Sequence, residues 1–414
     1  LFHKSIHYPK LSKNELDREI LDYVAEEEKV FYEAVKERKK IKSSDFQYYM
    51  YINFDIIHDI DNVYTFILKQ EAYLGGAHSD DMVRIFIIDM EEEKLVKPQS
   101  IIFDTQDNRD KLFELLQIAF EESDYQDFFF EDSLKEWVYS KKQTFDNIYF
   151  TNEDLVFVFD KYQVTAGAAG IPEIRLPIKD VTFLITEEWI NKFETMNDNL
   201  SQPIESEDDN KKEQIIEAEK EENKIISDKV VAITFDDGPH PENTLKILSL
   251  LEQYDAKATF FMLGARVDFY PEVTKEIYNK GHELGNHTWN HKNLTKLSKS
   301  ELEEEVQKTN EVIKDATDSY PSVLRPPYGA VNDEIRNAID LPVVLWTVDT
   351  LDWKSRDPQA VLESVKSDVK NRSVILFHDI YPETVEAIEL ALEYLQSEGY
   401  QFITVSELLD LSHR

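Results

Sequence analysis

Short apolar runs alternate with amphipathic stretches in the last part of the chain, from about Ser227 onward. The apolar runs predict strands, and the amphipathic stretches between them predict helices. One such helix repeats its less polar side chains at helical spacing from Leu302 and follows Ser298-x-x-Glu301, the pattern of a capping box. The predicted strands are Val230–Phe235, Ala258–Leu263, Glu283–His287, Val323–Pro326, Val343–Val348, Val374–His378 and Phe402–Ser406.

Strands that alternate with helices in this way form parallel sheets, because each crossover helix returns the chain to the same edge. About seven such units predict an α/β fold of the (β/α) barrel type, in which functional residues lie at the carboxyl ends of the strands. Polar segments follow or overlap the predicted strands, and we therefore expect them to form one shared site. These segments are Asp236–His240, His287–His291, Arg325–Gly329, Asp349–Trp353 and Leu376–Asp379.

The first 200 residues read as α+β. We predict two accessory domains there, residues 1–75 and 76–200, followed by an acidic linker over residues 201–227 and the barrel over residues 228–414. The glycine-containing segment Tyr73–His78 predicts a tight turn between strands, with His78 as a turn residue rather than a ligand. The other expected elements are strands Tyr48–Ile56, Val83–Ile88, Leu155–Phe159 and Val181–Ile185 and a helix near Asp110–Glu122.

The composition narrows the choice of partners and ligands. With 83 acidic side chains against 46 Lys and Arg, the 414-residue chain has a formal net charge of -37, which argues against nucleic acid as a partner. The chain has no cysteine, so any metal must be held by histidine and carboxylate. It also has no signal-peptide-like or membrane-spanning apolar run, and we expect any export segment or membrane anchor to lie outside it.

Two carboxylates and two imidazoles are the candidate metal-site residues. Adjacent strand side chains face opposite ways, so Asp236 and Asp237 serve one site only if Gly238-Pro239 breaks the strand. His287 and His291 are four residues apart, which places both imidazoles on one side of a helical or turn-like segment. With Asp237 they make a three-ligand site with open positions, typical of hydrolytic Zn²⁺. Each motif alone is also compatible with an ordinary turn or a surface histidine pair.

The segment that begins at Arg325 offers electrostatic groups. Two prolines predict a rigid loop that leaves the Tyr328 amide without a regular partner, so this N–H can stabilise an oxyanion. The planar guanidinium of Arg325 presents paired N–H donors that suit a carboxylate, and Asp236 is its expected partner. The alternative is a purely structural turn.

A histidine and a carboxylate supply the candidate general acid. Asp352 beside His378 would keep the imidazole protonated, so that it can give a proton to a leaving amine. Trp353 and Leu376 would wall a methyl-sized apolar pocket. The alternative for both is an ordinary place in the core.

In order and spacing, the five segments resemble the motifs of the polysaccharide deacetylase family, which is carbohydrate esterase family four or the NodB homology domain. The resemblance covers roughly Asp228–His413. It implies a distorted (β/α) barrel that removes acetyl groups from N-acetylated β-1,4-linked glycans with a divalent metal, most often Zn²⁺, with Co²⁺ or Mn²⁺ as alternatives.

The resemblance also implies a role for each motif residue. The metal ligands would be Asp237, His287 and His291. Asp236 would be the catalytic base, Arg325 would orient it, the Tyr328 amide would donate to the oxyanion, His378 supported by Asp352 would be the acid, and Trp353 and Leu376 would line the acetyl pocket.

The segment Tyr73–His78 is similar to one in accessory domains that precede this catalytic domain in Gram-positive cell-wall deacetylases. This resemblance favours peptidoglycan over chitin-like glycans as the substrate, with N-acetylglucosamine and N-acetylmuramic acid both open. It implies an extracellular or cell-surface location with an anchored precursor. Two other functions stay open, an O-acetyl esterase acting on xylan and a glycan-binding protein with a silent site, although the intact motif set argues against the second.

Overall fold

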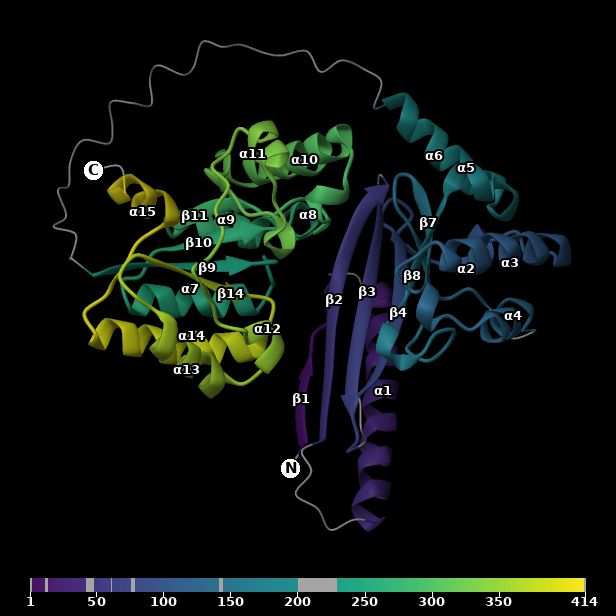
Figure 1. Ribbon diagram of the computed structural model, residues 1–414, viewed down its shortest axis with the longest axis horizontal. Helices are drawn as coiled ribbons and strands as arrows, with labels where there is room; N and C mark the ends of the chain where they lie inside the picture. Colours follow the sequence, from purple (N-terminus) through teal and green to yellow (C-terminus); the bar gives the residue numbers. More distant parts are fainter. Residues whose placement is uncertain are drawn as a thin grey trace. The chain divides into compact units, whose positions relative to one another are not determined.

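The computed structural model describes residues 2–11, 14–41, 48–60, 62–75, 79–140, 144–199 and 229–412. The chain divides into two compact units, Leu1–Glu207 and Asp208–Arg414 (Figure 1). The predicted acidic linker over residues 201–227 lies outside the described residues, and so does His78. Within the described ranges, no helix is both long enough and apolar enough to cross a bilayer.

A five-stranded sheet with the order β1-β2-β3-β4-β5 organises the first unit. Its strands are β1 (Phe2–Ile6), β2 (Tyr48–Ile60), β3 (Val63–Tyr73), β4 (Asp80–Asp89) and β5 (Lys94–Val96). The long helix α1 (Asn14–Ile41) lies against this sheet, since Gln70 Nε2 in β3 donates to Glu27 Oε2 at 3.2 Å. The Tyr23 ring of α1 also packs edge-on against Phe86 of β4.

The domain boundary predicted between residues 75 and 76 is wrong. β3 ends at Tyr73 and β4 begins at Asp80, and the two strands pair with each other in an antiparallel hairpin. Side chains of this hairpin such as Ile67 share a single buried core with residues from farther along, including Leu116 and Phe157. A boundary at residue 75 would separate two hydrogen-bonded strands and divide that core.

A three-stranded antiparallel sheet, ordered β6-β7-β8, and several helices complete the first unit. The strands are β6 (Ile148–Phe150), β7 (Asp154–Val158) and β8 (Glu173–Pro177), and the helices are α2 (Pro98–Ile101), α3 (Gln106–Glu121), α4 (Glu131–Tyr139), α5 (Ile178–Val181) and α6 (Glu187–Asn199). The strand predicted over Val181–Ile185 is wrong. Instead, α5 and a following 3₁₀ turn bury Val181 and Leu184, which are three residues apart and therefore share one side of the turn.

Parallel strands form the sheet of the second unit, as the strand and helix alternation predicts. They are β9 (Val230–Asp236), β10 (Ala258–Met262), β11 (Glu283–Asn286), β12 (Val323–Leu324), β13 (Val348–Asp349), β14 (Ser373–His378) and β15 (Gln401–Phe402). The order is β12-β11-β10-β9-β14-β13, and β15 pairs with the first residues of β9.

This sheet closes into a ring through residues 343–349. Val343 makes a parallel bridge with Leu324 of β12, whereas β13, at the other end of the same run, pairs with β14. The run thus changes partner along its length, which is why the predicted strand Val343–Val348 pairs only near its ends. The result is a distorted (β/α) barrel.

Helices follow the strands around the barrel (Figure 1). They are α7 (Asn243–Gln253), α8 (Gly264–Phe269), α9 (Pro271–Asn279), α10 (Lys299–Thr317), α11 (Asp333–Ala338), α12 (Asp352–Ser355), α13 (Pro358–Asp368), α14 (Pro382–Ser397) and α15 (Val405–Ser412). The predicted capping box is confirmed, because Ser298 and Glu301 exchange hydrogen bonds at the start of α10. The predicted strand Phe402–Ser406 is shorter than expected, since Val405 already begins α15.

The strand register brings distant parts of the chain to one edge of the barrel. Asp236, the last residue of β9, lies level with His378 of β14 and Phe261 of β10. Apolar side chains of the same strands, such as Phe235 and Phe377, pack into the core beneath the helices. The polar residues at the strand ends are therefore carried by a rigid, hydrogen-bonded framework.

Candidate active site

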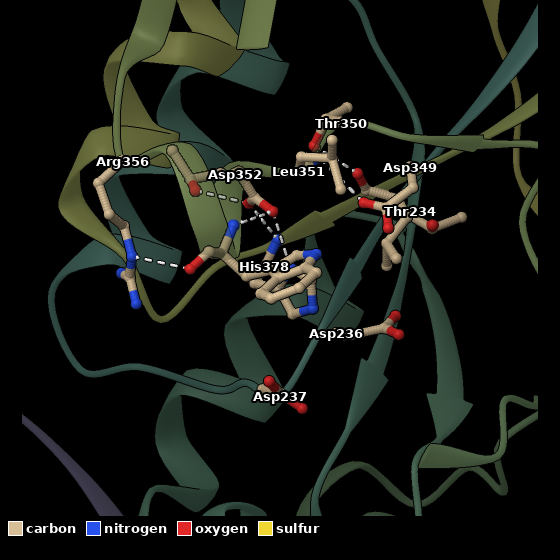
Figure 2. A network of polar contacts seen from close by, with 12 residues as sticks. Thr234, Asp236, Asp237, Asp349, Thr350, Leu351, Asp352, Arg356 and His378 are labelled. Atoms are coloured by element: carbon tan, nitrogen blue, oxygen red, sulfur yellow. Dashed lines mark hydrogen bonds and ion pairs between the residues drawn. The ribbon is translucent and has the colours of Figure 1, made fainter. Parts of the chain in front are cut away.

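Two adjacent carboxylates lie at the carboxyl end of β9. Asp236 is only 3% exposed. Asp237 has a φ of 71°, so the regular alternation of the strand stops one residue before the expected break at Gly238. Both carboxylates consequently lie beside His378, as Figure 2 shows.

Asp237, His287 and His291, the predicted metal ligands, lie together. Asp237 Oδ1 is 3.4 Å from Nε2 of His287 and 3.3 Å from Nε2 of His291, and the three ligand atoms lie within 4.8 Å of one another. Asp237 Oδ1 is also buried and accepts no hydrogen bond from the residues that the structure describes. An unsatisfied buried carboxylate oxygen that faces two imidazole nitrogens fits a divalent cation, and these ligand types suit zinc.

Hydrogen bonding fixes the orientation of His287. Its Nδ1 lies 2.6 Å from the carbonyl oxygen of Arg325, which can only accept, so Nδ1 carries a proton, and in the neutral imidazole Nε2 then presents its lone pair to Asp237. A lone pair that faces a carboxylate is unfavourable unless a proton or a metal cation lies between them. This arrangement is a second reason why the residues fit a metal.

Charges within the site shift the pKa values of its groups. Burial raises the pKa of Asp237, but the imidazoles of His291 and His287 outweigh burial and hold this pKa below its usual range. Burial lowers the pKa of His287, but Asp236 and Asp237 outweigh it and raise this pKa. The carboxylates and imidazoles therefore stabilise one another's charges even without a metal.

The two histidines are held by a loop rather than by a helix. His291 has a φ of 60°, in the left-handed region. Glu305 of α10 is only 4% exposed, and its Oε2 accepts the backbone N–H of Trp289 at 2.8 Å and that of Asn290 at 3.0 Å. A buried carboxylate on a neighbouring helix thus fixes the backbone between the two candidate ligands.

Arg325 contacts Asp236, as the sequence predicts. Its Nη1 donates to Asp236 Oδ1 and to Thr234 Oγ1, both at 2.7 Å. The guanidinium is fully buried, and its central carbon lies 4.0 Å from the centroid of the Phe261 ring. Burial lowers the pKa of Arg325 while Asp236 opposes this change, and an arginine stays charged under such conditions.

His378 is held by Asp352 (Figure 2). Nδ1 of His378 lies 2.8 Å from Asp352 Oδ1, and the backbone N–H of His378 donates to Asp352 Oδ2, also at 2.8 Å. Burial lowers the pKa of His378, but Asp352 outweighs burial and raises it to about 9. At neutral pH the imidazole is therefore protonated, with Nδ1–H directed at Asp352 and Nε2–H available to another acceptor.

Three more predicted site residues differ in exposure. Tyr328 has a φ of 60°, is 69% exposed, and its ring centroid lies 4.6 Å from that of His291. Leu376 is 3% exposed and shares a face of β14 with His378, two residues later. Trp353 is 46% exposed beside Asp352 at the start of α12. Tyr328 therefore adjoins one of the candidate metal ligands, Leu376 lies in the interior, and Trp353 lies at the surface.

Sequence reasoning missed polar residues that support the site. Thr234 contacts Arg325, Thr384 Oγ1 donates to Asp352 Oδ2 at 2.7 Å, and Glu305 anchors the histidine loop. Glu305 had a readable signal, because it lies three residues after Leu302 on the less polar side of its helix. The two threonines resemble any others in the sequence, and only the fold reveals their contacts.

Asp379, which follows His378, was also given no role of its own. It is fully buried, accepts a hydrogen bond from Thr244, and burial raises its pKa to about 7. A Cβ atom at position 238 would lie 2.3 Å from Asp379 Oδ2. Gly238 is therefore required where the loop after β9 passes this carboxyl group.

Comparison with known proteins identifies the family. The sequence model of the family described as polysaccharide deacetylase matches residues 223–341. The peptidoglycan-N-acetylmuramic acid deacetylase PdaC of Bacillus subtilis is 31% identical over 409 residues, which are 98% of this chain and 85% of PdaC. The chain belongs to the polysaccharide deacetylase family. As a member of this family it is a hydrolase that acts on amide bonds.

Other similarities of this polysaccharide deacetylase extend over less of the chain. The peptidoglycan-N-acetylglucosamine deacetylase PgdA of Listeria monocytogenes is 40% identical over 185 residues, or 45% of this chain and 40% of PgdA. A structure of peptidoglycan deacetylase PdaC from Bacillus subtilis matches 45% of this chain and 93% of that chain, with 40% identity and a TM-score of 0.44. Residues 95–179 match a protein family of unknown function, DUF3298.

Proposed function

We propose that the chain removes acetyl groups from amino sugars of peptidoglycan, N-acetylglucosamine or N-acetylmuramic acid, in a metal-dependent hydrolysis that releases acetate. The observation that carries this proposal is the buried Asp237 Oδ1, which faces two imidazole nitrogens beside Asp236 and His378 and accepts no hydrogen bond within the described part of the chain. The similarity to PdaC over 98% of the chain supports peptidoglycan as the substrate.

Asp237, His287 and His291 would hold the metal, and Zn²⁺ is the ion that best suits one carboxylate and two imidazoles. A divalent cation at such a site lowers the pKa of water and polarises a carbonyl group. The lone pair of His287 Nε2 and the unsatisfied oxygen of Asp237 are already directed toward each other, so binding requires little rearrangement of these groups.

Asp236 is the proposed base. Its carboxylate accepts a proton from the attacking water while Arg325 holds Oδ1 at 2.7 Å, which leaves Oδ2 as the oxygen that faces the site. The new C–O bond forms at the acetyl carbonyl carbon. In the proposed mechanism the Tyr328 backbone N–H stabilises the negative charge that develops on the carbonyl oxygen.

His378 is the proposed acid. Its protonated imidazole gives the Nε2 proton to the sugar nitrogen as the C–N bond breaks, so the products are acetate and a free amine. Asp352 fixes the ring through Nδ1 and stabilises its positive charge. Leu376 and Trp353 would then contact the methyl group of the acetyl substituent.

Residues 1–200 would position the wall polymer or hold the barrel away from the membrane. The resemblance to wall-modifying enzymes supports an extracellular or cell-surface location, with any membrane anchor outside this chain. Removing the first unit should lower activity on intact sacculi far more than activity on short oligomers. Equal losses on both substrates would instead indicate a folding role.

Treating muropeptides with the purified chain and analysing the products by mass spectrometry tests the proposal. We expect the loss of one acetyl group per modified sugar, abolished by Asp236→Asn, by His287→Ala and by a chelator. Asp368→Asn is the matched control, since it makes the same chemical change on the exposed end of α13.

Turnover that survives complete metal removal would take the metal out of the mechanism. A clear preference for acetylxylan would indicate an O-acetyl esterase instead. Binding without turnover in the presence of zinc, cobalt or manganese would indicate a silent site.

A further inference from the structure

Arg356 is a cation at the rim of the site, and among the residues that the structure describes it has no carboxylate partner. It follows α12 with a φ of 48°, and its Nε donates to the carbonyl oxygen of Trp353 at 3.2 Å. Its guanidinium carbon lies 3.2 Å from the centroid of the Tyr381 ring. Its two Nη groups make no ion pair or hydrogen bond with any residue that the structure describes. In a chain with a net charge of -37, such a cation is conspicuous.

The guanidinium lies close to the general acid. The Tyr381 ring that it covers is 5.8 Å, centroid to centroid, from the imidazole of His378. The thickness of one side chain therefore separates Arg356 from His378. In Figure 2, Arg356 and Asp236 lie on opposite sides of His378. A group bound by Arg356 would thus sit beyond the leaving nitrogen, on the side away from the base.

The available Nη groups indicate the chemistry of a ligand. A guanidinium presents parallel N–H donors in a planar fork, and this fork matches the two oxygens of a carboxylate. Of the two amino sugars in peptidoglycan, N-acetylglucosamine is neutral. N-acetylmuramic acid carries a lactyl ether with a carboxylate, on the ring carbon next to the one that bears the acetamido group. When the amide nitrogen lies at His378, this carboxylate is a close neighbour of the same ring edge.

We propose that Arg356 forms a carboxylate subsite that recognises the free lactyl group of N-acetylmuramic acid. This inference rests on the proposed deacetylation and narrows its substrate. A stem peptide converts the lactyl carboxylate into a neutral amide, so the subsite favours glycan strands from which the peptides have been removed. The exposed Trp353, whose carbonyl oxygen holds Arg356, places the subsite at the open side of the barrel.

A structural role for Arg356 makes a different prediction. If the guanidinium only braces the Tyr381 ring against His378, its loss impairs the general acid for every substrate equally. A subsite instead discriminates between a charged and an uncharged form of one sugar. The useful measurement is therefore the ratio of the kcat/KM values for the two substrates rather than the rate on one of them.

The experiment compares two glycan oligomers as substrates of the zinc-loaded 414-residue chain. One is a peptide-free oligomer of alternating N-acetylglucosamine and N-acetylmuramic acid, and the other is the same oligomer with its carboxylates converted to methylamides. We expect kcat/KM to be roughly tenfold higher for the carboxylate form. Arg356→Gln should reduce this ratio to about one, and Arg356→Lys should retain part of it because the charge remains.

Arg372→Gln is the matched control. It removes the same charge from an exposed arginine just before β14, at the opposite end of the barrel strands, and should keep the wild-type ratio. Equal losses on both oligomers in Arg356→Gln would overturn the subsite, and so would a wild-type chain without preference.

If neither oligomer is deacetylated, the proposed function is wrong, but the carboxylate subsite can still be tested by binding. Calorimetric binding of the same two oligomers to the Asp236→Asn chain then tests Arg356 without turnover. Tighter binding of the carboxylate form, lost in the Asp236→Asn, Arg356→Gln double variant, supports the subsite. Equal affinities would overturn it.

Discussion

Glu305 gives a direct test of how the loop between the two candidate histidine ligands is held. Its Oε2 accepts two backbone N–H groups, from Trp289 at 2.8 Å and Asn290 at 3.0 Å, and its Oε1 lies 3.1 Å from Lys292 Nζ. Glu305→Gln keeps the size of the side chain and one carbonyl oxygen. It removes the negative charge on which all three contacts depend.

The size of the effect follows from these contacts. Hydrogen bonds to a charged group contribute about 1.5–3 kcal/mol each, roughly twice as much as neutral ones. Weakening two of them and losing the ion pair with Lys292, whose side chain is 27% exposed, should lower the free energy of unfolding by about 2 kcal/mol. Groups that orient metal ligands change metal affinity by about 10–100-fold, and we expect the affinity for zinc to fall about tenfold.

Two measurements separate these effects. Competition with a chromophoric chelator gives the Kd for zinc, and urea unfolding of the metal-free chain gives its stability. Glu303→Gln is the matched control on the same helix, because the Glu303 side chain is 54% exposed and lies 3.5 Å from Lys299 Nζ. We expect the control to change both quantities little. A Glu305→Gln chain that is less stable but binds zinc as tightly as the wild type would refute the reasoning.

Three further substitutions test other contacts. Arg325→Lys should lower kcat at least about tenfold, because an ammonium cannot reproduce the planar guanidinium that contacts Asp236, the proposed base, and steady-state kinetics check this. Asp352→Asn removes the charge that raises the pKa of His378 to about 9, so this pKa should fall toward 6.5 and the alkaline limb of the kcat profile should move to lower pH; an unmoved limb would contradict the assignment. Burial raises the pKa of Asp89, but Lys192 outweighs it and holds this pKa below 3.8. The stability that Asp89 contributes is therefore present above pH 3.8 and is lost as the pH falls through the lower folded-state pKa. The melting temperature of Asp89→Asn should accordingly be lower than that of the wild type near neutral pH, and the two should converge in strong acid.

The barrel could be predicted because its signals are local. Each buried strand is a short apolar run, and a break such as Gly238-Pro239 or Pro326-Pro327 marks where several of these runs end. Parallel pairing then brings the ends to one edge, so the residues after the breaks meet in one place. The cluster of Asp237 with the two histidines follows from this logic alone.

The first unit was harder to predict because its arrangement depends on distant contacts. The run Val181–Ile185 is rich in residues that favour strands, yet packing of Val181 and Leu184 into the core selects a 3₁₀ turn. The β3–β4 hairpin joins residues on both sides of the expected boundary, and nothing in the turn sequence reveals that the two strands share one core. Helix α1 did carry a readable signal, since Leu16, Ile20 and Val24 are buried at helical spacing.

The finer geometry of the site also lay beyond the sequence. Asp237, His291 and Tyr328 all have positive φ values although none is glycine. This conformation is uncommon for non-glycine residues, and in the histidine loop the contacts of Glu305 with the neighbouring backbone help to hold it. The order of residue types along the chain does not reveal which distant side chains hold these backbone conformations.

The level alignment of β9 and β14 has a consequence for how such an enzyme tolerates change. The proposed proton acceptor and proton donor, Asp236 and His378, lie on neighbouring strands, and the backbone hydrogen bonds between Ser373–His378 and Val231–Asp236 set the spacing of their backbones. Insertions or deletions in the long stretch of chain that joins the two strands leave this spacing untouched. Changes in that connecting stretch can therefore reshape the surface around the site while the backbones of Asp236 and His378 keep their register.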